Sequence, residues 1–196
     1  RALVKTQGSV NNIRAIHDNM KAKAAALTFT AKFFNGDNTT AATEFDGLKE
    51  RLTGDQALTY TGTLTLDKVD ELIDGVIGGP TALFMSKATR RTVNALRRAA
   101  GQATEVVSDS FGRQIDAYAG IPIGVIEEDK DGAAILADGE IYAIRMGVQE
   151  YVSGLQAGGM EVIDLGLNRT QYETLIEWIC GIAVFHPKAA ARLHSA

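Results

Sequence analysis

Residues 9–34 read SVNNIRAIHDNMKAKAAALTFTAKFF, and this stretch decides how the rest of the chain is interpreted. Apolar or small side chains recur in it every three or four residues, which is the spacing of one face of an amphipathic helix. They are Val10, Ile13, Ile16, Met20, Ala24, Leu27, Ala31 and Phe34. Ser9 is a suitable N-cap and Asn35-Gly36 a suitable end. A helix of about 26 residues would be roughly 39 Å long, so we expect a spine for the molecule.

The remainder predicts a few helices followed by many strands. We expect a short helix around 45–52, a strand at 57–64, a helix at 66–77 behind Thr65, a strand at 81–86 and a helix from 87, capped by Ser86 and closed by Gly101. From Val106 onward, glycines and acidic turns separate predicted strands at 113–120, 121–128, 133–137, 140–147, 149–154, 159–166 and 173–185. This order predicts an α+β fold rather than a regular βαβ alternation.

Composition narrows the class of protein. The chain has 196 residues, 45% of them hydrophobic and 22% charged, as in an ordinary globular protein. Its net charge of −4 argues against a surface that binds nucleic acid or anionic lipid throughout. One cysteine forms no internal disulfide. No run reaches the roughly 18 apolar residues of a membrane span, and the N-terminus lacks a signal-peptide pattern. We therefore expect no membrane partner.

Glu177, Cys180 and His186 lie within ten positions and pose the question of a thiol nucleophile. In a strand, Cys180 shares a face with Trp178 and Ile182, whereas Glu177 points the other way. His186 is six residues on, about 20 Å along an extended strand, which is too far for a catalytic base. We therefore interpret Cys180 as an apolar packing residue, with a hydrolase as the alternative.

The stretch EEDKDGAAILAD, residues 127–138, matches part of a calcium-loop template. Its flanks read as strands, where that motif requires helices, so the sequence favours a solvated acidic turn. A weak cation site is the alternative. Its ligands would be Glu127, Asp129, Asp131 and Asp138.

The predicted helix from 87 concentrates positive charge within twelve positions. These residues are Lys87, Arg90, Arg91, Arg97 and Arg98. Arginine is enriched at protein interfaces, so we expect candidate subunit contacts here. A solvated face and a nucleic-acid-binding surface are the alternatives, although no aromatic residues are interleaved with the cations.

Motifs for catalysis are absent from the sequence. It contains no G-x-x-x-x-G-K-S/T, G-x-S-x-G, H-E-x-x-H or C-x-x-C, and its three histidines are scattered. We expect no enzymatic activity, no catalytic residues and no cofactor.

Four stretches, taken in order, resemble the major capsid proteins of tailed bacteriophages, the family with the Hong Kong 97-type fold. They are the spine helix with FFNGDNTTAATEFDGLKERL (33–52), TALFMSKATRRTVNALRRAAG (81–101), DSFGRQIDAYAGIPIGVIEED (109–129) and DLGLNRTQYETLIEWICGIAVFHPKAAARL (164–193). The Y-x-G-I-P-I pattern in the third stretch is typical of the family. The resemblance extends from about Val10 to Leu193.

The resemblance implies a peripheral domain on the spine helix, residues 1–62 and 171–196, and an axial domain, residues 63–170. The family's N-terminal arm and extended loop precede the spine helix and are missing here, so we expect a fragment or a processed product. The glycine-rich stretch VSGLQAGGMEV would be a mobile loop near a local symmetry axis. Its candidate contact residues are Gly154, Gly158 and Gly159.

The implied function is structural. We expect an icosahedral phage or prophage capsid subunit that assembles with itself into pentamers and hexamers around double-stranded DNA, held only by loose contacts. A scaffold and a maturation protease are possible partners. The location would be the virion, and the host bacterial cytoplasm during assembly. The alternatives are an encapsulin-like nanocompartment shell and, below it, a nucleic-acid-binding module using residues 87–98.

Overall fold

The structure is a computed structural model that describes residues 13–103, 105–108, 112, 114–169 and 171–196. The helices are α2 Ile13–Asn35, α3 Leu48–Arg51, the 3-10 turn η1 Gly54–Gln56, α4 Leu66–Asp74 and α5 Lys87–Ala99. The first strands are β1 Ala57–Tyr60, β2 Ala82–Ser86, β3 Glu105–Ser108, β4 Gln114–Tyr118, β5 Ile121–Ile126 and β6 Ile141–Ile144. The remaining strands are β7 Val152–Gln156, β8 Glu161–Asn168, β9 Gln171–Glu177, β10 Cys180–Val184 and β11 Ala190–Ser195. The predicted α+β class is confirmed.

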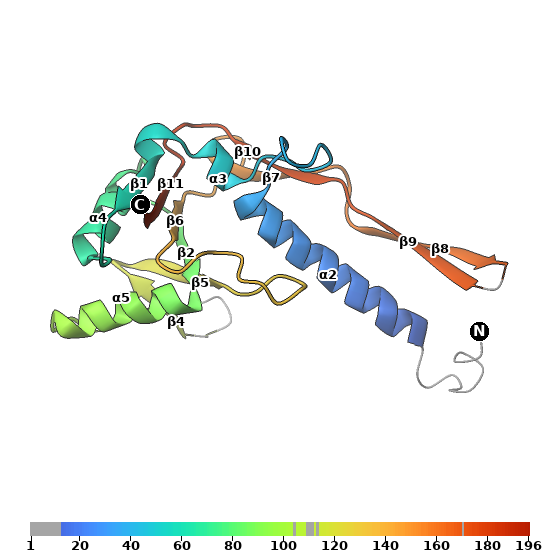
Figure 1. The fold of residues 1–196 in the computed structure, drawn as a ribbon, viewed down its shortest axis with the longest axis horizontal. Coiled ribbons are helices and arrows are strands. Elements are labelled where there is room, and N and C mark those ends of the chain that lie inside the picture. Colours follow the sequence, from blue (N-terminus) through green and yellow to red (C-terminus); the bar gives the residue numbers. More distant parts are fainter. Residues whose placement is uncertain (1–12, 104, 109–111, 113, 170) are drawn as a thin grey trace.

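A seven-stranded sheet forms the body of the molecule, with strand order β1-β11-β6-β2-β5-β4-β3 (Figure 1). β1 runs parallel to β11 and β2 runs parallel to β5, while the other neighbours are antiparallel. All four residues of β6 are buried, because helices and loops cover both faces of the sheet at its centre.

Alternation along β6 divides the interior into two cores. Ile141 and Ala143 pack with the apolar sides of α4 and α5. Tyr142 and Ile144 point to the opposite face and pack with the C-terminal end of α2, including Phe34. One strand thus joins both layers, as the period of two in a strand requires.

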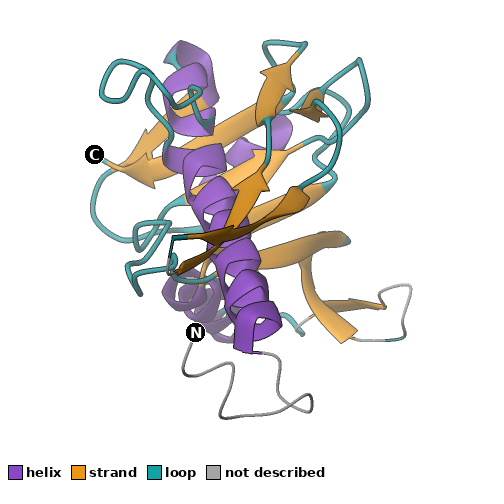
Figure 2. Cartoon of the chain, turned by 90° about the vertical axis from the view of Figure 1, so that its right-hand side faces the viewer, coloured by secondary structure: helices purple, strands orange, loops and turns teal. Residues whose placement is uncertain are grey.

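Two paired segments extend the chain beyond the body. β7 pairs antiparallel with β10, and β8 pairs antiparallel with β9. The β8–β9 hairpin and the N-terminal half of α2 project from the same side of the body (Figure 1). Figure 2 shows the molecule from the side towards which both segments project.

The ends predicted for α5 and the C-terminal end predicted for α2 agree with the structure, whereas the helix predicted at 66–77 ends at Asp74. Ser86 Oγ accepts the N–H of Thr89 at 3.1 Å, which confirms the N-cap of α5. Gly101 has φ +72°, and the N–H of Gln102 donates to the Arg97 carbonyl, so α5 closes with a Schellman motif. α2 ends at Asn35, as predicted. Ser9 lies outside the described residues.

Glycine is required where the loop after α2 crosses the end of that helix. Gly47 donates its N–H to the Gly36 carbonyl at 2.8 Å. A Cβ at Gly47 would lie 2.7 Å from the carbonyl oxygens of Lys32 and Phe34. Because backbone atoms cannot move aside as a flexible side chain can, the crossing admits no methyl group.

We expect Gly47→Ala to lower the free energy of unfolding by about 1–3 kcal/mol, the usual cost of overpacking. Urea unfolding followed by circular dichroism measures it. Gly159→Ala is the matched control, since a Cβ there meets no atom within 4 Å, and its effect should stay within about 0.5 kcal/mol. Equal stability of the two variants would contradict the close crossing.

Several predicted elements differ from those observed. The predicted strand at 133–137 is a loop, in which Ile135 and Leu136 are buried under the end of α2 by packing rather than by a strand ladder. The single strand predicted at 173–185 is two strands, β9 and β10, with a break at Trp178 and Ile179. β11 was not predicted, and it lies between β1 and β6 inside the sheet.

Strand pairing crosses the predicted domain limits. A limit at residue 171 separates β8 from β9, which form one hairpin, and β11 pairs with β6 of the body although it follows that limit. The division into peripheral and axial parts therefore stays a prediction about assembly.

Among the described residues, no helix is both long and apolar enough to cross a membrane.

Candidate assembly surfaces

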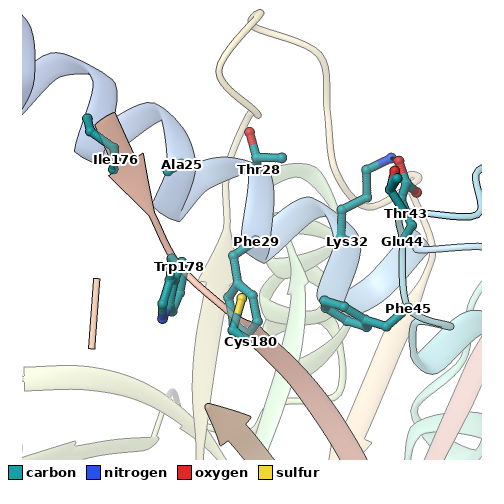
Figure 3. Close-up of a pocket in the computed structure, with 10 residues that line it drawn as sticks. All are labelled: Ala25, Thr28, Phe29, Lys32, Thr43, Glu44, Phe45, Ile176, Trp178 and Cys180. Atoms are coloured by element: carbon teal, nitrogen blue, oxygen red, sulfur yellow. Dashed lines mark ion pairs between the residues drawn. The ribbon is translucent and has the colours of Figure 1, made fainter. Parts of the chain in front are cut away.

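A pocket of about 400 Å³ lies between α2, the loop at 43–45 and the β9–β10 segment (Figure 3). Aromatic rings form its walls: the centroids of Phe29 and Trp178 are 4.9 Å apart, and those of Phe29 and Phe45 are 5.9 Å apart. The ion pair between Lys32 Nζ and Glu44 Oε1, at 2.7 Å, lies at one end. The apolar side chains around the pocket pack α2 against the strands.

Alternation along β9 and the following residues determines which side chains face α2. Ile176, Trp178 and Cys180 line the pocket, whereas Glu177 and Ile179 are exposed. The prediction that Cys180 and Trp178 share a face opposite Glu177 is therefore confirmed. The Nδ1 atom of His186 accepts the N–H of Lys188 at 3.0 Å.

The environment of Cys180 suits packing rather than nucleophilic chemistry. Burial raises the pKa of its thiol above the ordinary value, which lowers the fraction of reactive thiolate. Glu177, the nearest carboxylate along the chain, lies on the opposite face of the strand. Both features suit Cys180 to a packing role.

Asp37 orders the turn that carries the chain from α2 to the pocket. Its carboxylate accepts hydrogen bonds from the Thr39 hydroxyl at 2.6 Å, the Thr39 N–H at 2.8 Å and the Thr40 hydroxyl at 2.5 Å. These bonds, that of the Thr39 hydroxyl most of all, stabilise the ionised form and lower the pKa of Asp37 to about 2.

We expect the Asp37 carboxyl to titrate near pH 2 rather than at its ordinary 3.8. Because the pKa is lower in the folded state, the turn contributes stability above pH 3.8 and loses it as the pH falls through about 2. A carboxyl-detected NMR titration measures the midpoint. Thr39→Val should move it back towards 3.8, and an unshifted midpoint in the parent chain would contradict the hydrogen bonds.

The structure does not bring the four acidic residues of 127–138 together. Glu127 forms an ion pair with Lys87 at 2.9 Å, and Asp131 pairs with Lys130 at 2.7 Å. Asp129 Oδ1 accepts backbone N–H groups of its own turn, which lower its pKa. Asp138 accepts a hydrogen bond from Ser86 at 3.1 Å. Within the described residues, no group of three or more His, Cys, Asp or Glu is placed to hold a metal.

The cations of α5 divide into three groups. Arg90 forms an ion pair with Asp116 at 3.5 Å, and Lys87 forms one with Glu127 at 2.9 Å. Arg91 and Arg98 are exposed and lie seven residues apart, on one side of the helix. A contact between these two arginines and another subunit stays a prediction.

Arg97 must be removed from the candidate contacts. Its side chain is 2% exposed, and its guanidinium donates to the carbonyls of Ala117 at 2.6 Å and Ala103 at 3.0 Å. It also lies 5.4 Å from the centre of the Tyr118 ring. Arg97 therefore fastens α5 to β4 inside the chain, where no partner can reach it.

The three candidate glycines lie at and beside a break in the strands. Gly154 belongs to β7 and pairs with Ile182, while Gly158, with φ +79°, and Gly159 lie between β7 and β8. The break on the opposite strand is at Trp178 and Ile179. Contact by these glycines with another subunit stays a prediction.

Exposed apolar side chains on the projecting segments are the surface feature that sequence reasoning missed. On α2, Ile16, Met20 and Leu27 are 51%, 61% and 40% exposed. The hairpin exposes a second set: Val162, Ile163, Leu165, Leu167 and Leu175. Their spacing predicts burial, but sequence periodicity does not distinguish burial in the chain's own core from burial against a partner.

No protein-family model matches the sequence, and no curated protein matches it. Solved structures do match in fold. The encapsulin of the holo-SrpI encapsulin complex from Synechococcus elongatus PCC 7942 is similar over 96% of this chain and 68% of its own, with a TM-score of 0.78 and 20% identity. The capsid of an empty GTA particle is similar over 95% of this chain and 67% of its own, with a TM-score of 0.57 and 15% identity.

These similarities concern the fold. The chain has the Hong Kong 97-type fold of capsid and encapsulin shells, which confirms the fold that the sequence resemblance implied.

Proposed function

We propose that the chain is a structural subunit of a closed protein shell and that it assembles with copies of itself. The observation that carries the proposal is the combination of a shell-type fold with apolar side chains left exposed on the projecting segments. A monomer rarely exposes large contiguous apolar surface, so such surface marks an interaction site.

The proposal has two forms, which differ in what the shell encloses. The sequence resemblance favours a phage or prophage capsid around double-stranded DNA, with the virion as its location, the host cytoplasm as its place of assembly, and a scaffold and a maturation protease as partners. The greater similarity in fold to an encapsulin, with TM-scores of 0.78 against 0.57, favours a nanocompartment shell that encloses protein. Fold alone does not decide between the two.

Size-exclusion chromatography with light scattering and negative-stain imaging tests the shell function, using protein expressed from the complete reading frame that encodes this chain. We expect pentamers, hexamers or closed particles. A protein that stays monomeric at every concentration and salt would overturn the proposal. Nuclease-protected DNA in particles from the native host would identify a capsid, and one abundant co-purifying protein would identify a nanocompartment.

The nucleic-acid-binding alternative rests on Arg91 and Arg98, the exposed arginines of α5. If it held, the chain would bind duplex DNA tightly and the affinity would fall steeply with salt. Weak binding to duplex DNA at low salt would contradict this alternative.

A further inference from the structure

α2 has an outer side that faces away from its own hairpin. Ala25 and Phe29 line the pocket and therefore face the β9–β10 segment. Leu27 is two residues from each of them, which places it about 200° around the helix. Met20 lies seven residues before Leu27 and shares its side of the helix. Both are exposed. We call Ile16, Met20 and Leu27 the outer side of α2.

The hairpin likewise has an outer face. Ile176 lines the pocket beside Ala25, so the face that it shares with Val162 is turned towards α2. Ile163 and Leu175 are the next cross-strand pair and lie on the opposite face, each 42% exposed. Glu161 and Glu177, also paired and exposed, belong to this outer face, as does Glu173. These five residues are the outer face of the hairpin.

The two surfaces carry opposite charge. The outer face of the hairpin presents three glutamates, two of which are directly paired across the strands. Like charges in that position destabilise a strand pair, so a cation placed over Glu161 and Glu177 would be favourable. On α2, the exposed Lys23 lies beside Met20 and Leu27 at spacings of three and four.

The surfaces also agree in size and position. Residues 13–27 of α2 are about 22 Å long, and the eight residues of β8 extend about 26 Å. Both segments project in the same direction (Figure 1). Their outer surfaces face away from each other, because Ala25 and Ile176 line the pocket between them. One copy can therefore present its hairpin to one neighbour while its helix meets the hairpin of another, as a head-to-tail contact requires.

We propose that the outer face of the β8–β9 hairpin of one copy packs on the outer side of α2 of a second copy. Ile163 and Leu175 then cover Met20 and Leu27, and Lys23 lies over the paired Glu161 and Glu177. This contact rests on the proposed shell function and names the surface through which neighbouring copies meet. Each copy uses both surfaces once, so the contact repeats from subunit to subunit.

Charge reversal on each surface tests the contact. We expect Glu161→Lys/Glu177→Lys, and separately Lys23→Glu, to raise the concentration needed for half-assembly at least about tenfold, because like charges then meet across the interface. Mixing the two variants restores complementary contacts and should return assembly towards that of the parent chain. Glu50→Lys/Asp55→Lys, at exposed acids outside both surfaces, is the matched control and should assemble as the parent does.

Cysteine trapping gives an independent result that does not depend on full assembly. In a Cys180→Ser background, a Met20→Cys chain and a Leu175→Cys chain should form a disulfide-linked pair when mixed under oxidation, and neither should do so alone. If both charge variants assemble as the parent does and no disulfide links the Met20→Cys and Leu175→Cys chains, this interface is overturned. The proposed function still stands in that case, provided that the parent forms shells. A parent that never self-associates overturns both.

Discussion

Glu140→Ala is expected to lower the free energy of unfolding by about 3–5 kcal/mol, the cost of leaving one member of a buried ion pair without its partner. Glu140 is 5% exposed, and its Oε1 accepts the Nε–H of Arg192 at 2.6 Å and the hydroxyl of Tyr142 at 3.0 Å. Its Oε2 accepts the N–H of Ala137 at 3.1 Å. One carboxylate therefore satisfies three donors.

The position of these residues explains the size of the effect. Arg192 and Tyr142 are cross-strand partners on β11 and β6, so the ion pair lies between two strands in the interior of the sheet. Burial, and after it the charge of Glu140, raises the pKa of Tyr142, which keeps its hydroxyl protonated as a donor. Without the carboxylate, the guanidinium and the hydroxyl remain desolvated and lose their acceptor.

Chemical denaturation of parent and variant measures this loss. Glu44→Ala is the matched control, because it breaks the Lys32–Glu44 pair, whose side chains are 38% and 24% exposed; solvent screening should limit its effect to about 1 kcal/mol or less. A Glu140→Ala protein as stable as the Glu44→Ala protein would show that the ion pair contributes little.

Phe34→Ala is expected to cost about 3–5 kcal/mol, the usual range for removing a buried aromatic ring. Phe34 is 2% exposed, and its ring centroid lies 5.1 Å from that of Tyr142 and 6.0 Å from that of Phe84. It is the residue at which the apolar stripe of α2 enters the core. Removing it leaves a cavity between the helix and the sheet.

Phe185→Ala provides the comparison, because Phe185 is 51% exposed and loses less buried area; we expect an effect of less than about 1 kcal/mol. Thermal unfolding by calorimetry checks both. If Phe34→Ala unfolds at the parent's temperature, α2 is not anchored through this ring, and the description of the second core would have to change.

Local signals in the sequence identified the elements whose ends are set by neighbouring residues. Ser86 and Gly101 bound α5 because a hydroxyl acceptor and a left-handed glycine act within one helical turn. The same reasoning failed at 133–137, where Ile135 and Leu136 are buried by contact with a helix a hundred positions away. A buried apolar run can be a strand, a helix or a loop, so the sequence pattern alone could not determine the secondary structure of residues 133–137.

The candidate surfaces divide in the same way. The sequence identified the α5 cations but could not separate buried Arg97 from exposed Arg98, because the groups that surround Arg97 come from β4 and the segment at 103. It identified the apolar stripe of α2 but not its exposure, since Met20 and Phe34 share a periodicity and differ only in what surrounds them.

By itself the sequence determined the α+β class, the spine helix, the face of Cys180 and, through resemblance, the shell-type fold, because these depend on periodicity, capping and ordered motifs. Only the tertiary structure decided that β11 completes the sheet, that the terminal strand breaks at Trp178, and that Leu27 and Leu175 lie on opposite outer surfaces. Those features depend on contacts between residues far apart in the chain, and side-chain burial is a property of the folded arrangement.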